Sequence, residues 1–130
     1  MIKKYKIFNI LILLLLVLIS GCSTYSAVGL VELQTNNGYE ISFLSLEGTL
    51  NKKLYKTDKD TAINYNCKLE IGEVNIYYKT SLENNKTLIC NIKAGEELSG
   101  FSGYVNQGDR ATIIIETVKK SKGSFNFSYN

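Results

Sequence analysis

The chain has 130 residues, enough for one domain, and carries 15 Lys and Arg against 12 Asp and Glu. It contains no histidine, tryptophan or proline. Without histidine, Ser-His-Asp and Cys-His catalytic sites and His-ligated zinc sites are excluded. Any chemistry would have to come from carboxylates, lysines, tyrosines or hydroxyl groups.

The positive charge is unevenly distributed along the chain. Lys3, Lys4 and Lys6 precede an apolar run, whereas all 12 acids follow residue 31. Removing the residues before position 22 therefore leaves 12 basic side chains (15 minus 3) against 12 acidic ones. A nucleic-acid-binding protein needs a net basic surface to displace counterions from phosphates. This chain has a single arginine, Arg110, and no long basic block, so we expect no nucleic-acid partner.

The N-terminal segment has the pattern of a secretory signal peptide. Residues 1–6 are cationic, and Ile7 begins a run to Ile19 that is apolar except for Asn9. A membrane-spanning helix needs roughly 20 apolar residues. This run of about 13 residues would reach only about 20 Å as a helix, so we expect a cleaved signal rather than a membrane span.

The end of the apolar run carries a family resemblance. Residues 18–22 read Leu-Ile-Ser-Gly-Cys and resemble the lipobox of bacterial lipoproteins, with Ile19 where leucine is commonest. The resemblance implies cleavage between Gly21 and Cys22, a diacylglyceryl group on the Cys22 thiol and acylation, such as palmitoylation, of the new amine. Ordinary signal-peptidase cleavage with an incidental cysteine is the alternative.

Lipidation would determine where the chain is located. Two acyl chains anchor a protein stably, at about 0.8 kcal/mol per buried CH₂, whereas one chain is marginal. We therefore expect a lipoprotein on the extracytoplasmic face of the cell membrane, or in the outer membrane of a host with two membranes. The expected organisation is a signal peptide over 1–21, a lipidated tether over 22–27 and one domain over 28–130.

The remaining chain alternates between apolar segments and turns rich in Asn, Gly and Asp. Side chains of one kind recur at every second position, which is typical of strands with one buried face. The pattern predicts an all-β fold, a single antiparallel sandwich or small barrel of about 8 or 9 short strands. The expected strands are 28–35, 39–46, 49–56, 63–71, 73–80, 87–93, 98–105, 111–118 and 124–129.

Glycines in the C-terminal half give a second resemblance. The stretches 71–76, 100–103 and 122–127, with Gly108 before an isoleucine-rich segment, resemble small secreted β-sandwich domains of bacterial lipoproteins, which are largely uncharacterised. In those domains the glycines sit at hairpin turns. The resemblance therefore bears on the fold and not on the function.

Cys67 and Cys90 are the two remaining thiols, and each is expected on the apolar face of its strand. An even pair in an exported domain permits a disulfide. The alternative is two small buried apolar residues. A catalytic thiol is not expected, because no histidine is present to activate it.

The other candidate site residues also have ordinary structural explanations. Asp58 and Asp60 have the spacing of a calcium-loop start, but Ala62 replaces the next ligand, so a solvated turn is favoured. The glutamates suggest no particular catalytic pair. Tyr39, Tyr55 and Tyr77 are candidates for an exposed aromatic row, although tyrosine is also common in strands.

These observations favour a membrane-anchored, non-enzymatic binding or envelope-associated module. The expected partners are the membrane, through the lipid, and a protein or glycan; no cofactor or metal is expected. The alternative is a small enzyme or enzyme-inhibitor module that uses carboxylates on loops. A concave pocket with two or more converging acids would favour the enzyme, and a flat surface with a tyrosine row or a free strand edge would favour binding.

Overall fold

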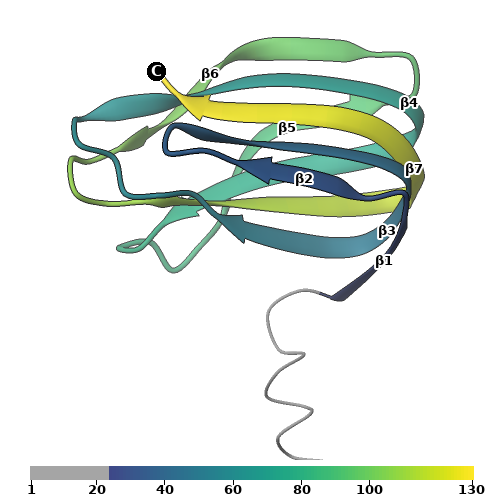
Figure 1. Ribbon diagram of the computed structural model, residues 1–130, viewed down its shortest axis with the longest axis horizontal. Helices are drawn as coiled ribbons and strands as arrows, with labels where there is room; N and C mark the ends of the chain where they lie inside the picture. The colour runs from purple at the N-terminus through teal and green to yellow at the C-terminus, as the bar shows by residue number, and fades with distance from the viewer. Residues whose placement is uncertain (1–23) are drawn as a thin grey trace, which may run out of the picture.

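Seven β-strands make up the computed structural model, which describes residues 24–130 (Figure 1). The strands are β1 (Thr24–Val28), β2 (Val31–Gln34), β3 (Gly38–Lys53), β4 (Thr61–Thr80), β5 (Thr87–Lys93), β6 (Glu97–Val105) and β7 (Ala111–Tyr129). All pairings are antiparallel. The predicted all-β antiparallel sandwich is therefore confirmed. The signal peptide, Gly21 and Cys22 lie outside the described residues.

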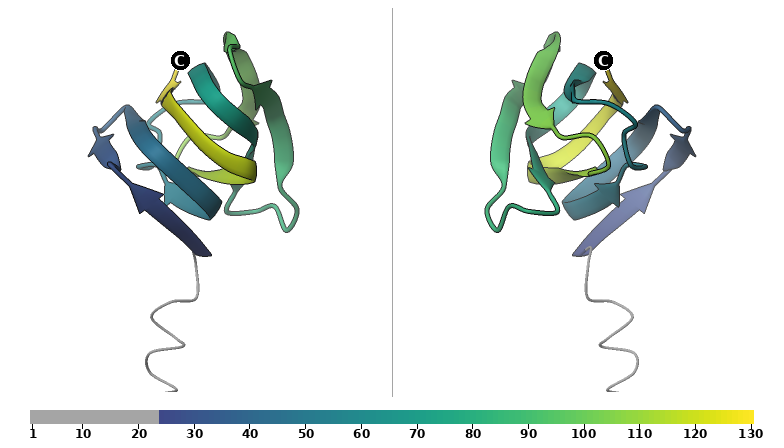
Figure 2. Two further views of the ribbon diagram at one scale, coloured as in Figure 1. Left: turned by 90° about the vertical axis from the view of Figure 1, so that its right-hand side faces the viewer. Right: turned by 90° about the vertical axis from the view of Figure 1, so that its left-hand side faces the viewer.

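The sandwich has two five-stranded layers because β3, β4 and β7 each run through both. Figure 2 shows these long strands curving from one layer into the other. In the first sheet the order is β2, the start of β3, the end of β7, the start of β4 and β6. In the second sheet it is β1, the end of β3, the start of β7, the end of β4 and β5. Each long strand thus contributes to both sides of the core.

The strands bend where the pairing register slips. In β3 the register shifts between Phe43 and Leu46 and again before Thr49; in β4 it shifts repeatedly over residues 69–74. Gly48 and Gly72 lie at these bends with φ of 113° and 96°, a region that favours glycine. The seven strands are roughly consistent with the 8 or 9 short strands predicted; the number is lower because three expected breaks are bulged bends inside continuous strands.

The inner faces of both sheets form one apolar core. Ile41, Phe43, Phe125 and Phe127 from the first sheet are fully buried, and the Phe43 and Phe125 rings pack edge to face at 5.4 Å. The second sheet contributes a similar set, which includes Leu50, Val74, Ile76, Ile92, Ile113 and Ile115.

Ile71 and Leu88 face solvent, although the alternation of apolar residues at 67, 69 and 71 and at 88, 90 and 92 predicts that they face inward. Ile71 is 58% exposed because it lies in the β4 bend, and Leu88 is 50% exposed. A bulge places Cys90 opposite Ile76 but Leu88 opposite Tyr77, so the alternation reverses between Cys90 and Leu88.

The N-terminal boundary of the domain also differs from the prediction. Thr24–Val28 forms β1 and pairs with β3 from Thr49 to Ser45, so a strand begins within the segment 22–27 that was expected to be a tether. The predicted strand over 28–35 is the separate β2, Val31–Gln34. In the part of the chain that the structure describes, no helix is long and apolar enough to span a bilayer.

Candidate functional site

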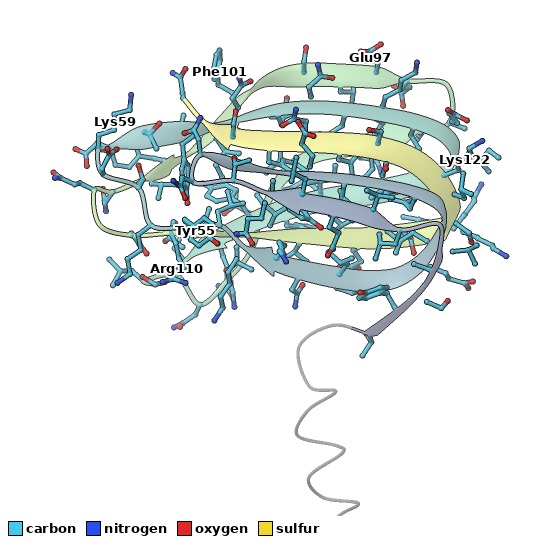
Figure 3. The ribbon with its side chains drawn as sticks, viewed as in Figure 1. Tyr55, Lys59, Glu97, Phe101, Arg110 and Lys122 are labelled. Carbon is cyan, nitrogen blue, oxygen red and sulfur yellow. The ribbon has the colours of Figure 1, made fainter. Side chains whose placement is uncertain are left out.

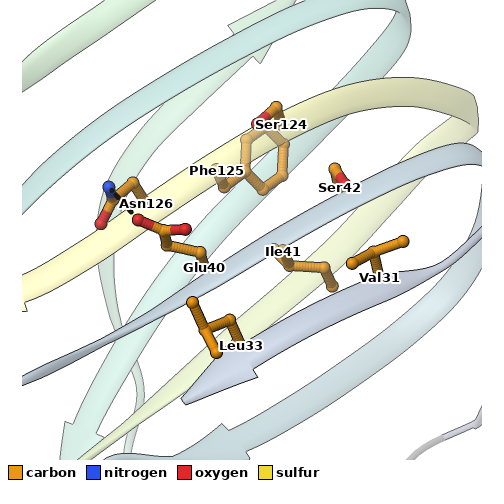
Figure 4. Close-up of a pocket in the computed structure, with 8 residues that line it drawn as sticks. All are labelled: Val31, Leu33, Glu40, Ile41, Ser42, Ser124, Phe125 and Asn126. Carbon is orange, nitrogen blue, oxygen red and sulfur yellow. Dashed lines mark hydrogen bonds between the residues drawn. The ribbon is translucent and has the colours of Figure 1, made fainter. Parts of the chain in front are cut away.

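A polar groove crosses the outer face of the first sheet, where β2, β3 and β7 lie side by side (Figure 4). Its main hollow has a volume of about 250 Å³. A second hollow of about 230 Å³ continues it toward the β2–β3 turn, and both are lined by Leu33, Glu40 and Asn126. Together they form one elongated depression along the strands.

Strand register places the groove residues in rows across the sheet. One row runs from Leu33 through Glu40 and Asn126 to Asn66, on β2, β3, β7 and β4. The neighbouring row runs from Val31 through Ser42 and Ser124 to Lys68. Neighbouring strands lie about 4.8 Å apart, so side chains of one row are close enough to contact one ligand together.

Glu40 and Asn126 form the polar centre of the groove. The Asn126 amide nitrogen Nδ2 donates a hydrogen bond of 3.1 Å to Glu40 Oε1, drawn as a dashed line in Figure 4. This contact fixes the orientation of both planar groups on adjacent strands. An amide and a carboxylate held in this way offer several donor and acceptor positions to a ligand hydroxyl group.

Apolar side chains flank the polar centre. Val31 and Leu33 stand on the edge strand β2, and Leu33 is 55% exposed although it is large and apolar. At the opposite edge of the same face, Phe101 on β6 pairs with Asn64 and is 63% exposed (Figure 3). The face therefore combines hydroxyl and amide groups with apolar side chains at both edges.

The predicted aromatic row is wrong, because its three tyrosines lie in three separate places. Tyr39 is 1% exposed, and its hydroxyl donates a 2.7 Å hydrogen bond to Glu32. Tyr55 is exposed in the segment after β3. Tyr77 is half-buried on the outer face of the second sheet, where the Lys86 ammonium lies 4.2 Å from its ring centroid.

Cys67 and Cys90 are both free thiols, one fully buried and one half-buried. They come from different sheets, Cys67 on the first part of β4 and Cys90 on β5, and Cys90 packs against the core that contains Cys67. A hydrogen bond with Cys90 raises the pKa of the Cys67 thiol, and burial raises it further. The structure thus brings together the two residues that the sequence singled out.

Among residues 24–130, no three or more Cys, Asp or Glu side chains gather into a group that could hold a metal ion. Asp60 accepts a hydrogen bond from the Gln107 amide at 2.8 Å, and a hydrogen bond with Asp60 raises the pKa of Tyr104. Asp58 lies at the exposed turn before β4. Four hollows in the described part of the chain have a single lining acid each: Glu40 in both halves of the groove, and Glu83 and Asp58 in the other two.

The contact between Glu40 and Asn126 was not predicted from the sequence. Asn64 and Asn66 alternate with Tyr65 and Cys67 in the sequence, which indicates a polar outward face but not its partner strands. Residues 40 and 126 are adjacent only because β3 and β7 pair, and that pairing is not visible in the local pattern.

No family model matches the chain, and no curated protein sequence matches it. Several solved structures are similar in shape. A variant of a family 29 carbohydrate-binding module is 14% identical, with a TM-score of 0.44 over 84% of this chain and 79% of that one. A family 61 carbohydrate-binding module in complex with β-1,4-galactotriose is 12% identical, with a TM-score of 0.44 over 83% of this chain and 85% of that one. These low values assign neither a family nor a function to the chain.

Proposed function

We propose that the chain is a non-enzymatic binding module of the cell envelope, which holds a neutral glycan in the groove of the first sheet. The observation that carries this proposal is the Glu40–Asn126 pair, set between apolar side chains on a rigid sheet face. A sugar ring presents hydroxyl groups at its rim and C–H groups on its faces. The groove offers planar polar groups that can bond to the sugar hydroxyl groups. Val31 and Leu33 can contact the C–H faces of the ring.

The charge on this face favours a neutral ligand. Along the rows of the first sheet, the charged outward residues are Glu40, Lys68, Glu97 and the ion pair Lys122–Glu70, and the others are Ser or Asn together with Val31, Leu33 and Phe101. A face of mixed and low charge gives little long-range attraction to an anionic polymer. Hydroxyl and amide groups instead favour a ligand rich in hydroxyl groups.

The distribution of acids supports binding rather than hydrolysis. Glycosidase chemistry requires two carboxyl groups about 5 to 9.5 Å apart on either side of the scissile bond. The groove is lined by the single acid Glu40. Glu40 therefore serves, in this proposal, as a hydrogen-bond acceptor for ligand hydroxyl groups.

The proposal also places the chain on the extracytoplasmic face of the membrane, held by lipid on Cys22. β1, which follows Cys22 closely, belongs to the second sheet, whereas the groove lies on the first. An anchor at this point would leave the groove on the side of the sandwich away from the anchored strand. That arrangement suits a module that binds a glycan in the cell envelope.

Binding can be tested by titrating the full chain with neutral oligosaccharides of three to six β-1,4-linked glucose, mannose, galactose or N-acetylglucosamine units. We expect at least one series to bind, and Glu40→Ala to weaken it about ten-fold, because a hydrogen bond to a charged group contributes about 1.5–3 kcal/mol. Isothermal titration calorimetry measures the affinity of the wild type and of the variant.

Glu47→Ala is the matched control, because Glu47 is exposed on the same strand but lies in the second sheet, opposite Ser26. It should leave the affinity unchanged. Equal losses in both variants, or no binding by any of the four series, would contradict the proposal.

A further inference from the structure

The largest of the described hollows lies on the other side of the molecule, at one end of the second sheet. It has a volume of about 380 Å³ and is lined by Lys53 on β3, Lys79 on β4 and Arg110 just before β7. Thr112 and Glu83 also line it. Figure 3 labels Arg110 at this end of the molecule. The hollow shares no lining residue with the groove.

Strand pairing places two of these cations close together. Lys53 and Lys79 are both cross-strand partners of Thr112, one on each side of β7. The backbones of Lys53 and Lys79 are two strand spacings apart, about 10 Å. The side chains of Lys53, Lys79 and Thr112 point to the outer face, because the adjacent residues Ile113 and Tyr78 are buried in the core. An ion above Thr112 would therefore lie between two ammonium groups.

Among residues 24–130, none of these three cations forms a salt bridge, although the Asp109 carboxylate lies next to Arg110 and interacts with its charge. The ion pairs among residues 24–130 are Lys86–Glu116 and Lys122–Glu70. Glu83 is the one acid that lines the hollow, and it is exposed. Three positive side chains and one acid thus line this hollow.

The wall next to Arg110 is held in place by Asp109. Its Oδ1 accepts hydrogen bonds from the Arg110 amide at 2.7 Å and from the Ser81 amide at 3.3 Å, and the Ser81 hydroxyl also donates to it. The hydrogen bond from Ser81 lowers the pKa of Asp109, and the positive charge of Arg110 also contributes. These contacts join the β4–β5 turn to the start of β7 and fix the backbone at Arg110.

We infer that this hollow is a binding site for a phosphate-type oxyanion, with Arg110, Lys53 and Lys79 as the binding residues. Arg110 is the only arginine in the chain, and a guanidinium group matches two oxygens of a phosphate with two parallel hydrogen bonds. The two lysines supply compact charges beside it, and the Thr112 hydroxyl is a further donor. The phosphate can come from a soluble phosphorylated molecule or from an anionic lipid headgroup.

The test uses the full chain in phosphatidylcholine nanodiscs, with inorganic phosphate added at constant ionic strength. Amide NMR signals of Ser81 and Thr112 should shift with saturation, whereas those of Asn126 in the groove should not. Arg110→Gln and Lys79→Gln should each weaken phosphate binding about ten-fold. Glu83→Gln should strengthen it, because that change removes the nearby negative charge.

Lys68→Gln is the matched control, since Lys68 is exposed on the same strand as Lys79 but lies in the first sheet. It should leave phosphate binding unchanged. A second arm replaces part of the phosphatidylcholine with phosphatidylglycerol and adds no phosphate. Shifts of Ser81 and Thr112 in this arm identify a lipid headgroup as ligand, and shifts in the phosphate arm alone identify a soluble one.

The inference is overturned if neither arm shifts these signals, or if Arg110→Gln and Lys79→Gln bind phosphate as the wild type does. Loss of phosphate binding leaves glycan binding in the groove unaffected, because the two sites lie on opposite sheets. The outcomes of the two proposals are therefore distinguishable.

Discussion

Cys67 and Cys90 meet between the two sheets, one from β4 and one from β5. Their thiol–thiol hydrogen bond raises the pKa of Cys67 and lowers the pKa of Cys90, while burial opposes ionisation of both. A buried thiol with a raised pKa is a poor nucleophile. Attack on an external disulfide would therefore begin at Cys90, which is also the more exposed of the two.

We predict that oxidised glutathione converts the pair into a disulfide. The two thiols lose two protons and two electrons, and the oxidised glutathione is reduced to two thiols. Closing a loop of about 24 residues should raise the free energy of unfolding by about 3 kcal/mol. Intact mass spectrometry with alkylation and urea unfolding, each before and after reduction, measure the two effects.

Cys90→Ser should abolish the stability gain from oxidation while leaving the reduced protein folded. Complete alkylation of both wild-type thiols, measured on protein unfolded in urea after prolonged oxidation, would show that the pair does not bond. The structure has both cysteines in the reduced state, so the prediction concerns what an oxidising compartment adds to an existing contact.

At the level of elements, the bends in the long strands join the two sheets. Gly72 lies in the β4 bend with φ of 96°, and a Cβ atom there would lie 2.2 Å from Ser121 Oγ and 2.6 Å from the Lys120 carbonyl oxygen. Gly95, in the β5–β6 turn, has a similar φ of 86° but no atom within 4 Å of such a Cβ. The two positions separate the effect of backbone conformation from that of close packing.

We predict that Gly72→Ala destabilises the sandwich more than Gly95→Ala. Both variants carry the cost of a left-handed residue, about 1–2 kcal/mol, but Gly72→Ala also forces β7 away from β4. The extra loss should be about 2 kcal/mol or more, because a clash in a packed region requires backbone shifts. Urea unfolding curves of both variants measure the difference, and equal losses would mean that the bend accommodates a methyl group freely.

These bends also explain which parts of the fold were predictable from the sequence. Alternation correctly predicted the inward positions Cys67, Leu69, Val74 and Ile76, because side-chain period is a local property. It gave strand breaks near residues 47, 72 and 120 because glycines and charges there resemble turns. Whether such a segment turns back or bends depends on the partner strand, which lies up to 86 residues away, as for Glu40 and Asn126.

The candidate site was less predictable than the fold for the same reason. Residues 40 and 126 are ordinary outward positions on their own strands, and only the β3–β7 pairing makes them neighbours. The predicted exposure of the tyrosines was wrong for a related reason, because strand pairing can also bury a residue. Tyr39 was expected to be exposed, but β2 covers it and supplies Glu32 as the acceptor for its hydroxyl group.

At the scale of the whole molecule, the two proposed sites occupy different sheets of one sandwich. The groove lies on the first sheet, while β1 and the Lys53–Lys79–Arg110 hollow belong to the second. Between Cys22 and the first residue of β1 there is only Ser23. Lipid on Cys22 would therefore hold the second sheet close to the membrane surface, because two residues span at most about 7 Å.

We predict that Cys22→Ser abolishes lipid attachment without changing the stability of the sandwich. The wild-type chain, extracted from membranes, should carry a diacylglyceryl group at residue 22 by intact mass and should partition into detergent. The variant should remain unprocessed or appear outside the membrane fraction. Its free energy of unfolding should change by no more than about 0.5 kcal/mol, because all the core residues lie between Tyr39 and Tyr129.

Ser20→Ala is the matched control for this prediction. It changes one hydroxyl group two positions before the cysteine and keeps a small residue where the lipobox pattern requires one, so lipid attachment should persist. A wild-type mass without diacylglyceryl would contradict the anchor, and the groove would then belong to a secreted rather than a tethered module. Loss of cooperative unfolding in Cys22→Ser would instead show that the sandwich depends on its anchor, which the closed core between the two sheets argues against.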